Sequence, residues 1–193
     1  MTLALAFLLL VLTVPVAGGR LSRLENLRLR WVWLAVLAVA IQVLLLAVVP
    51  DGDTGWHRAL HLATYALAGA CVIANLRQVR FLWVVALGGV LNLIAIAAND
   101  GVMPASRSAL ETAGLDERDG SFTNSDAVTD ANLAFLGDVF AIPASWPASN
   151  VFSVGDVVML VGAFLLLHAA TGSRLFGGRR TERLPAQGSP AAR

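Results

Sequence analysis

Long apolar runs alternate with short polar segments along this chain. The apolar runs cover about 3–17, 31–49, 59–76, 81–98 and 151–170. A helix needs roughly 20 residues to cross the hydrocarbon core of a bilayer, with about 17 as the lower limit. Open strands would expose unpaired backbone groups to lipid, so membrane-crossing runs of this kind form helices. The pattern predicts an all-α integral membrane protein with five transmembrane helices, of which the first is short.

The composition supports a membrane protein. The 193 residues are 57% hydrophobic and only 14% charged, whereas charged residues make up about a quarter of a soluble domain. Cys71 is the single cysteine, so neither a disulfide framework nor a cysteine-based metal site can form within one chain. We expect no metal, no cofactor and no nucleic-acid partner, and contacts with membrane lipid.

The arginines predict the orientation of the helices. All fourteen basic residues are arginine. Eleven of them fall on one side of the predicted membrane, in segments 18–30 and 77–80 and in the tail, and three fall on the other. Positive residues are enriched in cytoplasmic loops. The amino end is therefore predicted outside the cell and the carboxyl end inside.

This orientation divides the chain into one membrane domain, 1–171, and a polar cytoplasmic tail, 172–193, that we expect to be disordered. The first run resembles a signal peptide in length, but its arginines follow it instead of preceding it, which favours a retained helix. Residues 99–150 form a long, acidic extracytoplasmic loop between the fourth and fifth helices. Within it, Ser106–Ala113 is expected to form one or two helical turns that end at Gly114.

Polar side chains within the predicted spans are candidates for a functional site, because lipid cannot solvate them. They are Gln42, His61, Asn75, Asn92, Asn99 and Asp156. Most of them gather at the extracytoplasmic boundary, and only Asn75 lies near the cytoplasmic end. A proton or ion pathway would need polar groups across the whole membrane, so this distribution argues against one.

Asp156 has two interpretations. In the first, Ser153 and Asp156 form a capping box at the start of the last helix, and Asp156 only satisfies backbone amides there. In the second, Asp156 pairs with Asp138. Two close carboxylates in a poorly solvated site divide their protons unequally, so one can take a proton from water while the other donates one to a carbonyl. His57 and His61 have the spacing of metal ligands, but they lack a third ligand.

The second interpretation is supported by a resemblance. Gly137-Asp138-Val139-Phe140, a tryptophan-containing turn, and Phe152 to Asp156 resemble the last part of the lipoprotein signal peptidases (signal peptidase II). The upstream stretch "GGVLNLI" is similar to a second motif of that family and contains Asn92. The resemblance covers about a third of the chain. It implies that Asp138 and Asp156 are a catalytic pair and that a membrane-anchored peptide or lipoprotein is the substrate; Asn92, Asn99 and Ser153 would orient the substrate or a carboxylate.

Two further resemblances involve other parts of the chain. The motifs "NDGVMP" and "FLGD" with "NVFSVGD" resemble those of a bacterial multi-pass membrane family of unknown function, which implies a place in the bacterial cytoplasmic membrane. The stretch "HLATYALAG" is similar to a helix of the small VanZ-like membrane proteins. Two hypotheses follow: an intramembrane aspartyl hydrolase, or a non-catalytic envelope protein that binds a partner or lipid through its acidic outer loop.

Overall fold

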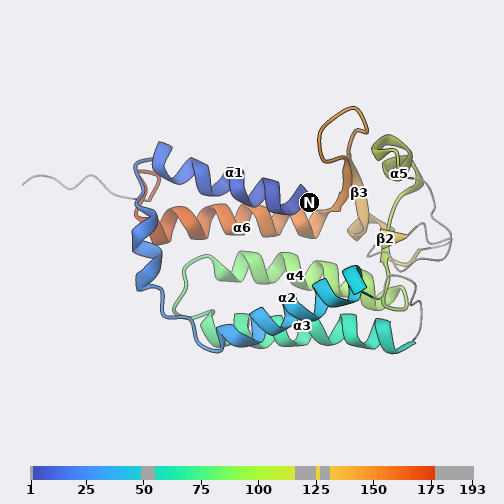
Figure 1. Cartoon of the computed structure of the whole chain (residues 1–193), viewed down its shortest axis with the longest axis horizontal. Helices are drawn as coiled ribbons and strands as arrows, with labels where there is room; N and C mark the ends of the chain where they lie inside the picture. Colours follow the sequence, from blue (N-terminus) through green and yellow to red (C-terminus); the bar gives the residue numbers. More distant parts are fainter. Residues whose placement is uncertain (1, 49–54, 116–124, 127–130, 177–193) are drawn as a thin grey trace, which may run out of the picture.

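The computed structural model describes residues 2–48, 55–115, 125–126 and 131–176. Its long helices are α1 (Thr2–Val16), α2 (Val32–Val48), α3 (Gly55–Asn75), α4 (Leu82–Ala98) and α6 (Val154–Thr171). They lie roughly along one axis, and consecutive long helices run in opposite directions (Figure 1). Each coincides with one of the predicted apolar runs to within a few residues.

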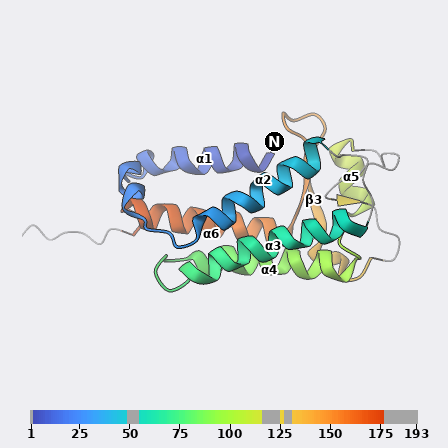
Figure 2. The same ribbon diagram turned by 60° about the horizontal axis from the view of Figure 1, so that its bottom comes forward.

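The short elements gather at one end of the bundle (Figures 1 and 2). They are β1 (Met103–Pro104), α5 (Arg107–Ala113), β2 (Ser125–Asp126), the 3-10 turn η2 (Ala134–Leu136), β3 (Asp138–Ile142) and β4 (Asn150–Ser153). β1 pairs with β2 in parallel, and β3 pairs with β4 in an antiparallel hairpin. The last apolar run therefore begins as a strand, and its helix starts only at Val154. The predicted tail lies almost wholly outside the described residues.

The predicted helix within the loop is confirmed. Ser106 caps α5 by accepting a hydrogen bond from the Ala109 amide, and Gly114 ends α5 in the left-handed conformation. Its apolar face packs with Ala105, Val151 and Ala141. The part of the 99–150 loop that the structure describes is thus a small folded cap on the bundle, and 116–124 and 127–130 lie outside the described residues.

Helices α4 and α6 form the central pair of the bundle, and glycines let them approach closely. A Cβ atom at Gly88 would lie 2.7 Å from the Met159 backbone nitrogen of α6, and one at Gly162 would lie 2.6 Å from the Val85 nitrogen of α4. Small residues at helix interfaces allow close backbone contact in membranes. This contact fixes α4 against the first turns of α6, where Asp156 lies.

The opposite end of the bundle contains a buried polar cluster. The His168 side chain is fully buried, with its ring nitrogens 3.0 Å from Thr13 Oγ1 and 2.9 Å from Ser173 Oγ. The 3-10 helix η1 (Leu21–Asn26) is tied to the end of α6 because the Arg20 amide donates to the Thr171 carbonyl. His168 lies within a predicted span but was not among the polar residues expected there, so the prediction that this end contains only Asn75 was wrong.

By length and composition, one described helix, Val154–Thr171, is long and apolar enough to cross a membrane. The other apolar helical stretches are shorter: Leu5–Val16, Val32–Leu45, Ala59–Asn75 and Leu82–Ala98. The structure itself contains no membrane, so the five spans and their orientation stay predictions.

Candidate functional site

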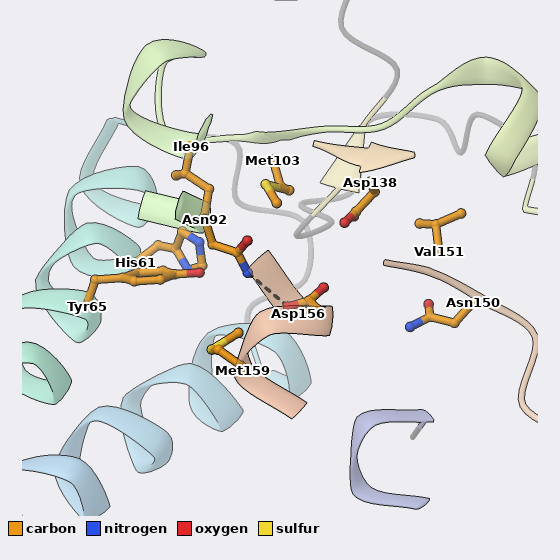
Figure 3. Close-up of a pocket in the computed structure, with 10 residues that line it drawn as sticks. All are labelled: His61, Tyr65, Asn92, Ile96, Met103, Asp138, Asn150, Val151, Asp156 and Met159. Carbon is orange, nitrogen blue, oxygen red and sulfur yellow. Dashed lines mark hydrogen bonds between the residues drawn. The ribbon is translucent and has the colours of Figure 1, made fainter. Parts of the chain in front are cut away.

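A cavity of about 330 Å³ lies where α3, α4 and α6 meet the β3–β4 hairpin. Both aspartates line it, together with Asn92, His61 and Tyr65, and Ile96, Met103 and Met159 supply apolar wall. Figure 3 shows the Asp138 and Asp156 side chains reaching into this cavity from different walls. The structure therefore brings together the two residues that the sequence analysis proposed as a pair.

Asp156 is the third residue of α6, and the predicted capping box is confirmed. The Asp156 amide donates to Ser153 Oγ at 3.0 Å, and the Ser153 amide donates to Asp156 Oδ2 at 3.0 Å. This arrangement satisfies two of the amides that a helix start leaves without partners. The same carboxylate also lines the cavity, so capping the helix and facing the cavity are compatible roles for Asp156.

Asn92 connects α4 to this cap. Its side-chain amide donates to Asp156 Oδ1 at 2.8 Å, and its side-chain oxygen accepts from Ser153 Oγ at 2.8 Å. A Cβ atom at Gly155 would overlap the Asn92 oxygen, so only glycine fits between them. Asp156 therefore accepts a hydrogen bond at each of its two oxygens, and its side chain has a fixed orientation toward the cavity.

Asp138 reaches the cavity because of the hairpin. It begins β3 and lies opposite Ser153 of β4 in the strand register. Its carbonyl accepts a hydrogen bond from the Ser106 amide at 3.0 Å. A Cβ at the preceding residue, Gly137, would overlap the Pro104 carbonyl oxygen, so the hairpin can lie against β1 only with glycine there. The Asp138 side chain is 4% exposed, and buried carboxylates need specific partners.

His61 and Tyr65 form the α3 side of the cavity. They are four residues apart and so share one helix face; their rings meet edge to face with centroids 5.5 Å apart. His61 Nδ1 lies 3.0 Å from Gln42 Oε1 of α2, which fixes the orientation of the imidazole. Tyr65 was not among the candidate site residues. The available signal was its spacing from His61 in "HLATYALAG".

The structure places Asn99 and Ser153 differently from the other candidates. Asn99 ends α4, and its side chain donates to the Ala95 and Asn132 carbonyls at 2.7 and 2.8 Å and accepts from the Asn132 amide at 2.9 Å. It is not among the residues that line the cavity. Asn99 instead anchors the chain segment that leads to Asp138. Ser153 is fully buried behind Asn92 and Asp156.

Among the described residues, no group of three or more His, Cys, Asp or Glu side chains is placed to hold a metal ion. The His57 side chain lies outside what the structure describes. The chemistry that the described cavity offers is thus that of two carboxylates, the two side-chain amides of Asn92 and Asn150, an imidazole and a phenol.

Comparisons with known proteins give a family but no activity. A protein-family model described as "Family of unknown function (DUF5317)" matches residues 26–168, a range that contains every candidate site residue. No curated protein matches the chain, and no solved structure does. The resemblance to the lipoprotein signal peptidases is not confirmed by these comparisons.

Proposed function

The chain belongs to the DUF5317 family, a family of unknown function, and from that premise we propose that it is a multi-pass membrane protein that hydrolyses amide bonds with Asp138 and Asp156. The observation that carries the proposal is that both carboxylates face one cavity of about 330 Å³. The cavity would lie at the extracytoplasmic boundary of the membrane.

The exposed surface of the long helices supports a membrane location. Large apolar side chains are exposed on all of them, including Leu12 on α1, Val36 on α2, Ile73 on α3, Val90 on α4 and Val161 on α6. Soluble monomers seldom expose apolar surface continuously over several helices. Lipid would cover these side chains. Segments 18–30 and 77–80 lie at one end of the bundle, and Arg107 of α5 lies at the other. The excess of arginine in the first two segments supports the proposed orientation.

The proposed reaction uses one water molecule and no covalent intermediate. One carboxylate takes a proton from water, whose oxygen bonds to the amide carbon, while the other carboxyl group donates its proton to the carbonyl oxygen. The first carboxyl group then gives the proton it took from water to the nitrogen, the C–N bond breaks, and the amine leaves. The hydroxyl formed from the carbonyl oxygen returns its proton to the second carboxylate as the new carboxylic acid forms. The hydrogen bonds from Asn92 and Ser153 hold Asp156 in place during these steps.

The test uses the full chain in lipid vesicles and a membrane-anchored peptide with a fluorophore and a quencher on either side of its cleavable bond. Asp138→Asn and Asp156→Asn should each lower the cleavage rate by about 100-fold or more, the size expected for lost acid–base catalysis. Both should still insert into the membrane. Wild-type cleavage by either variant, or no cleavage by the unchanged protein, would contradict the proposal.

A second candidate function is non-catalytic binding of a partner or lipid through the acidic outer loop. The observation that favours it is the capping box, which by itself explains why an acid stands at position 156. Asp156→Asn would then cost about 1 kcal/mol of stability, as for a lost cap, and little else. Asp156→Glu separates the two functions, because glutamate retains a carboxylate for the cap but displaces it from the cavity.

A further inference from the structure

A second cavity lies beside the first one. It has a volume of about 320 Å³, lies between α2 and α3, and is more open to the outside of the helix pair. Its wall is mostly apolar and formed by small residues, with Ala35, Ala38 and Val39 from α2 and Ala68 from α3. Gln42, His61, Thr64 and Tyr65 complete the wall, and His61 and Thr64 already bond to the Gln42 side-chain oxygen. Because the Gln42, His61 and Thr64 side chains are partnered within the wall, the recess suits a hydrocarbon chain better than a polar ligand.

The two cavities share part of their wall. His61 and Tyr65 line both of them. Figure 3 shows these two residues on the α3 side of the aspartate cavity, and Figure 2 shows α2 running beside α3. A molecule that occupied both cavities would pass these two side chains, with its polar part near the aspartates and its apolar part between α2 and α3.

We infer that the α2–α3 cavity binds the hydrocarbon chain of a single-chain amphiphile whose amide group enters the aspartate cavity. The inference rests on the proposed function and names its substrate class as an N-acyl amide held by the membrane. Chain burial would supply affinity, and His61 and Tyr65 would lie where the chain joins its amide.

The charges of the aspartate cavity select the kind of head group. Among the described residues, those that line it include two carboxylates and no arginine. A neutral amide, which can donate a hydrogen bond, is compatible with these groups, whereas the carboxylate of a free fatty acid would be repelled by like charge. The preferred ligand is therefore the amide of a fatty acid and not the acid.

The experiment is photolabelling of the full chain in phosphatidylcholine vesicles. The probe is palmitoyl glycinamide with a diazirine near the end of its chain, and the second probe is palmitic acid with the same diazirine. Labelled residues are located by mass spectrometry. We expect the amide probe to label segments 35–42 and 61–68 preferentially, and the acid probe to label them more weakly.

Two alanines on α3 provide a matched pair of variants. Ala68 lines the second cavity, whereas Ala66 is exposed on the outer surface. Ala68→Phe should fill the cavity and lower labelling there by about tenfold, the equivalent of 1.4 kcal/mol, and Ala66→Phe should leave it unchanged. Ala35→Leu fills the same cavity from α2, and it replaces Ala68→Phe in the experiment if that variant does not fold.

Labelling spread evenly over the lipid-facing residues of all helices, or equal labelling by both probes, would overturn the inference. Labelling that neither Ala68→Phe nor Ala35→Leu reduces would do so as well. Asp138→Asn separates this failure from failure of the proposed function, since it should stop hydrolysis and still allow labelling. If the unchanged protein is labelled in the cavity but cleaves no amide, only the proposed function fails.

Discussion

Ser153 does more than an ordinary helix cap, because its hydroxyl makes two hydrogen bonds. It accepts from the Asp156 amide and donates to the buried Asn92 oxygen. Ser153→Ala should therefore lose a cap worth about 1 kcal/mol and also leave the Asn92 oxygen without this donor, which costs about 1–3 kcal/mol. The free energy of unfolding in mixed detergent micelles measures this sum.

Ser106 is the matched control at the residue scale. It caps α5 by accepting from the Ala109 amide at 3.1 Å, and its hydroxyl also lies 3.3 Å from Ser108 Oγ near the surface. Ser106→Ala should cost only the cap, about 1 kcal/mol. Equal losses for the two variants would mean that the bond from Ser153 to Asn92 contributes nothing, and that Asn92 does not depend on the cap for its position.

At the scale of elements, the contact between α4 and α6 depends on the absence of side chains. A Cβ at Gly88 would overlap the Gly155 carbonyl and lie 2.6 Å from Met159 Cγ, whereas a Cβ at the adjacent Gly89 would have nothing within 4 Å. Gly88→Ala should destabilise the protein by about 1–3 kcal/mol through overpacking. Gly89→Ala should stabilise α4 by about 0.5–1 kcal/mol, since alanine loses less backbone entropy in a helix. Unfolding of both variants in micelles checks this, and a loss of stability in Gly89→Ala would contradict it.

The long helices could be predicted from the sequence, whereas the strands could not. The apolar runs located the long helices because hydrophobic length is a local property of the chain. Helix α3 begins at Gly55, before its predicted run, because its first turn includes the polar residues His57 and Arg58 and so was not part of the apolar run. The β3–β4 hairpin was not predicted, since its strands pair across Pro143 and Pro147 within a segment that resembles a turn.

Part of the candidate site could also be predicted from local sequence patterns, and part could not. The capping box could be identified from Ser153 and Asp156, because caps depend on residues three apart. The placement of Asp138 in the same cavity as Asp156 depends on the hairpin and on Gly137. It was therefore predicted from the chemistry of paired carboxylates and from a family resemblance, and not from a local sequence pattern. Asn99 is not among the residues that line the cavity, and at the end of α4 its side chain bonds to the Asn132 backbone.

At the scale of the whole molecule, the fold has two chemically different ends. One end contains the aspartate cavity, α5 and the two small sheets (Figure 1). The other contains η1 and the end of α6, where Arg23 approaches the Thr171 carbonyl and Arg80 lies 4.7 Å from the Phe81 ring centroid. If the membrane lies across the long helices, these ends face opposite compartments, and the arginines predict that the second end is cytoplasmic.

Cysteine labelling in intact bacterial cells measures this orientation. Cys71 is the single native cysteine and is buried. It is first replaced by alanine, so that each variant contains one cysteine at a chosen position. Ser108 on α5 and Ser22 in η1 are exposed at opposite ends of the bundle. A maleimide that cannot cross membranes should label Ser108→Cys in intact cells, and should label Ser22→Cys only after permeabilisation.

The reverse pattern would place the aspartate cavity on the cytoplasmic side, and labelling of both cysteines in intact cells would mean that η1 and α5 face the same compartment. The first result would remove the physical basis for an outward-facing hydrolase, because the substrate amide would then have to reach Asp138 and Asp156 from the cytoplasmic side. The second would contradict the predicted orientation of the helices, because the two ends of the bundle would not lie on opposite sides of the membrane.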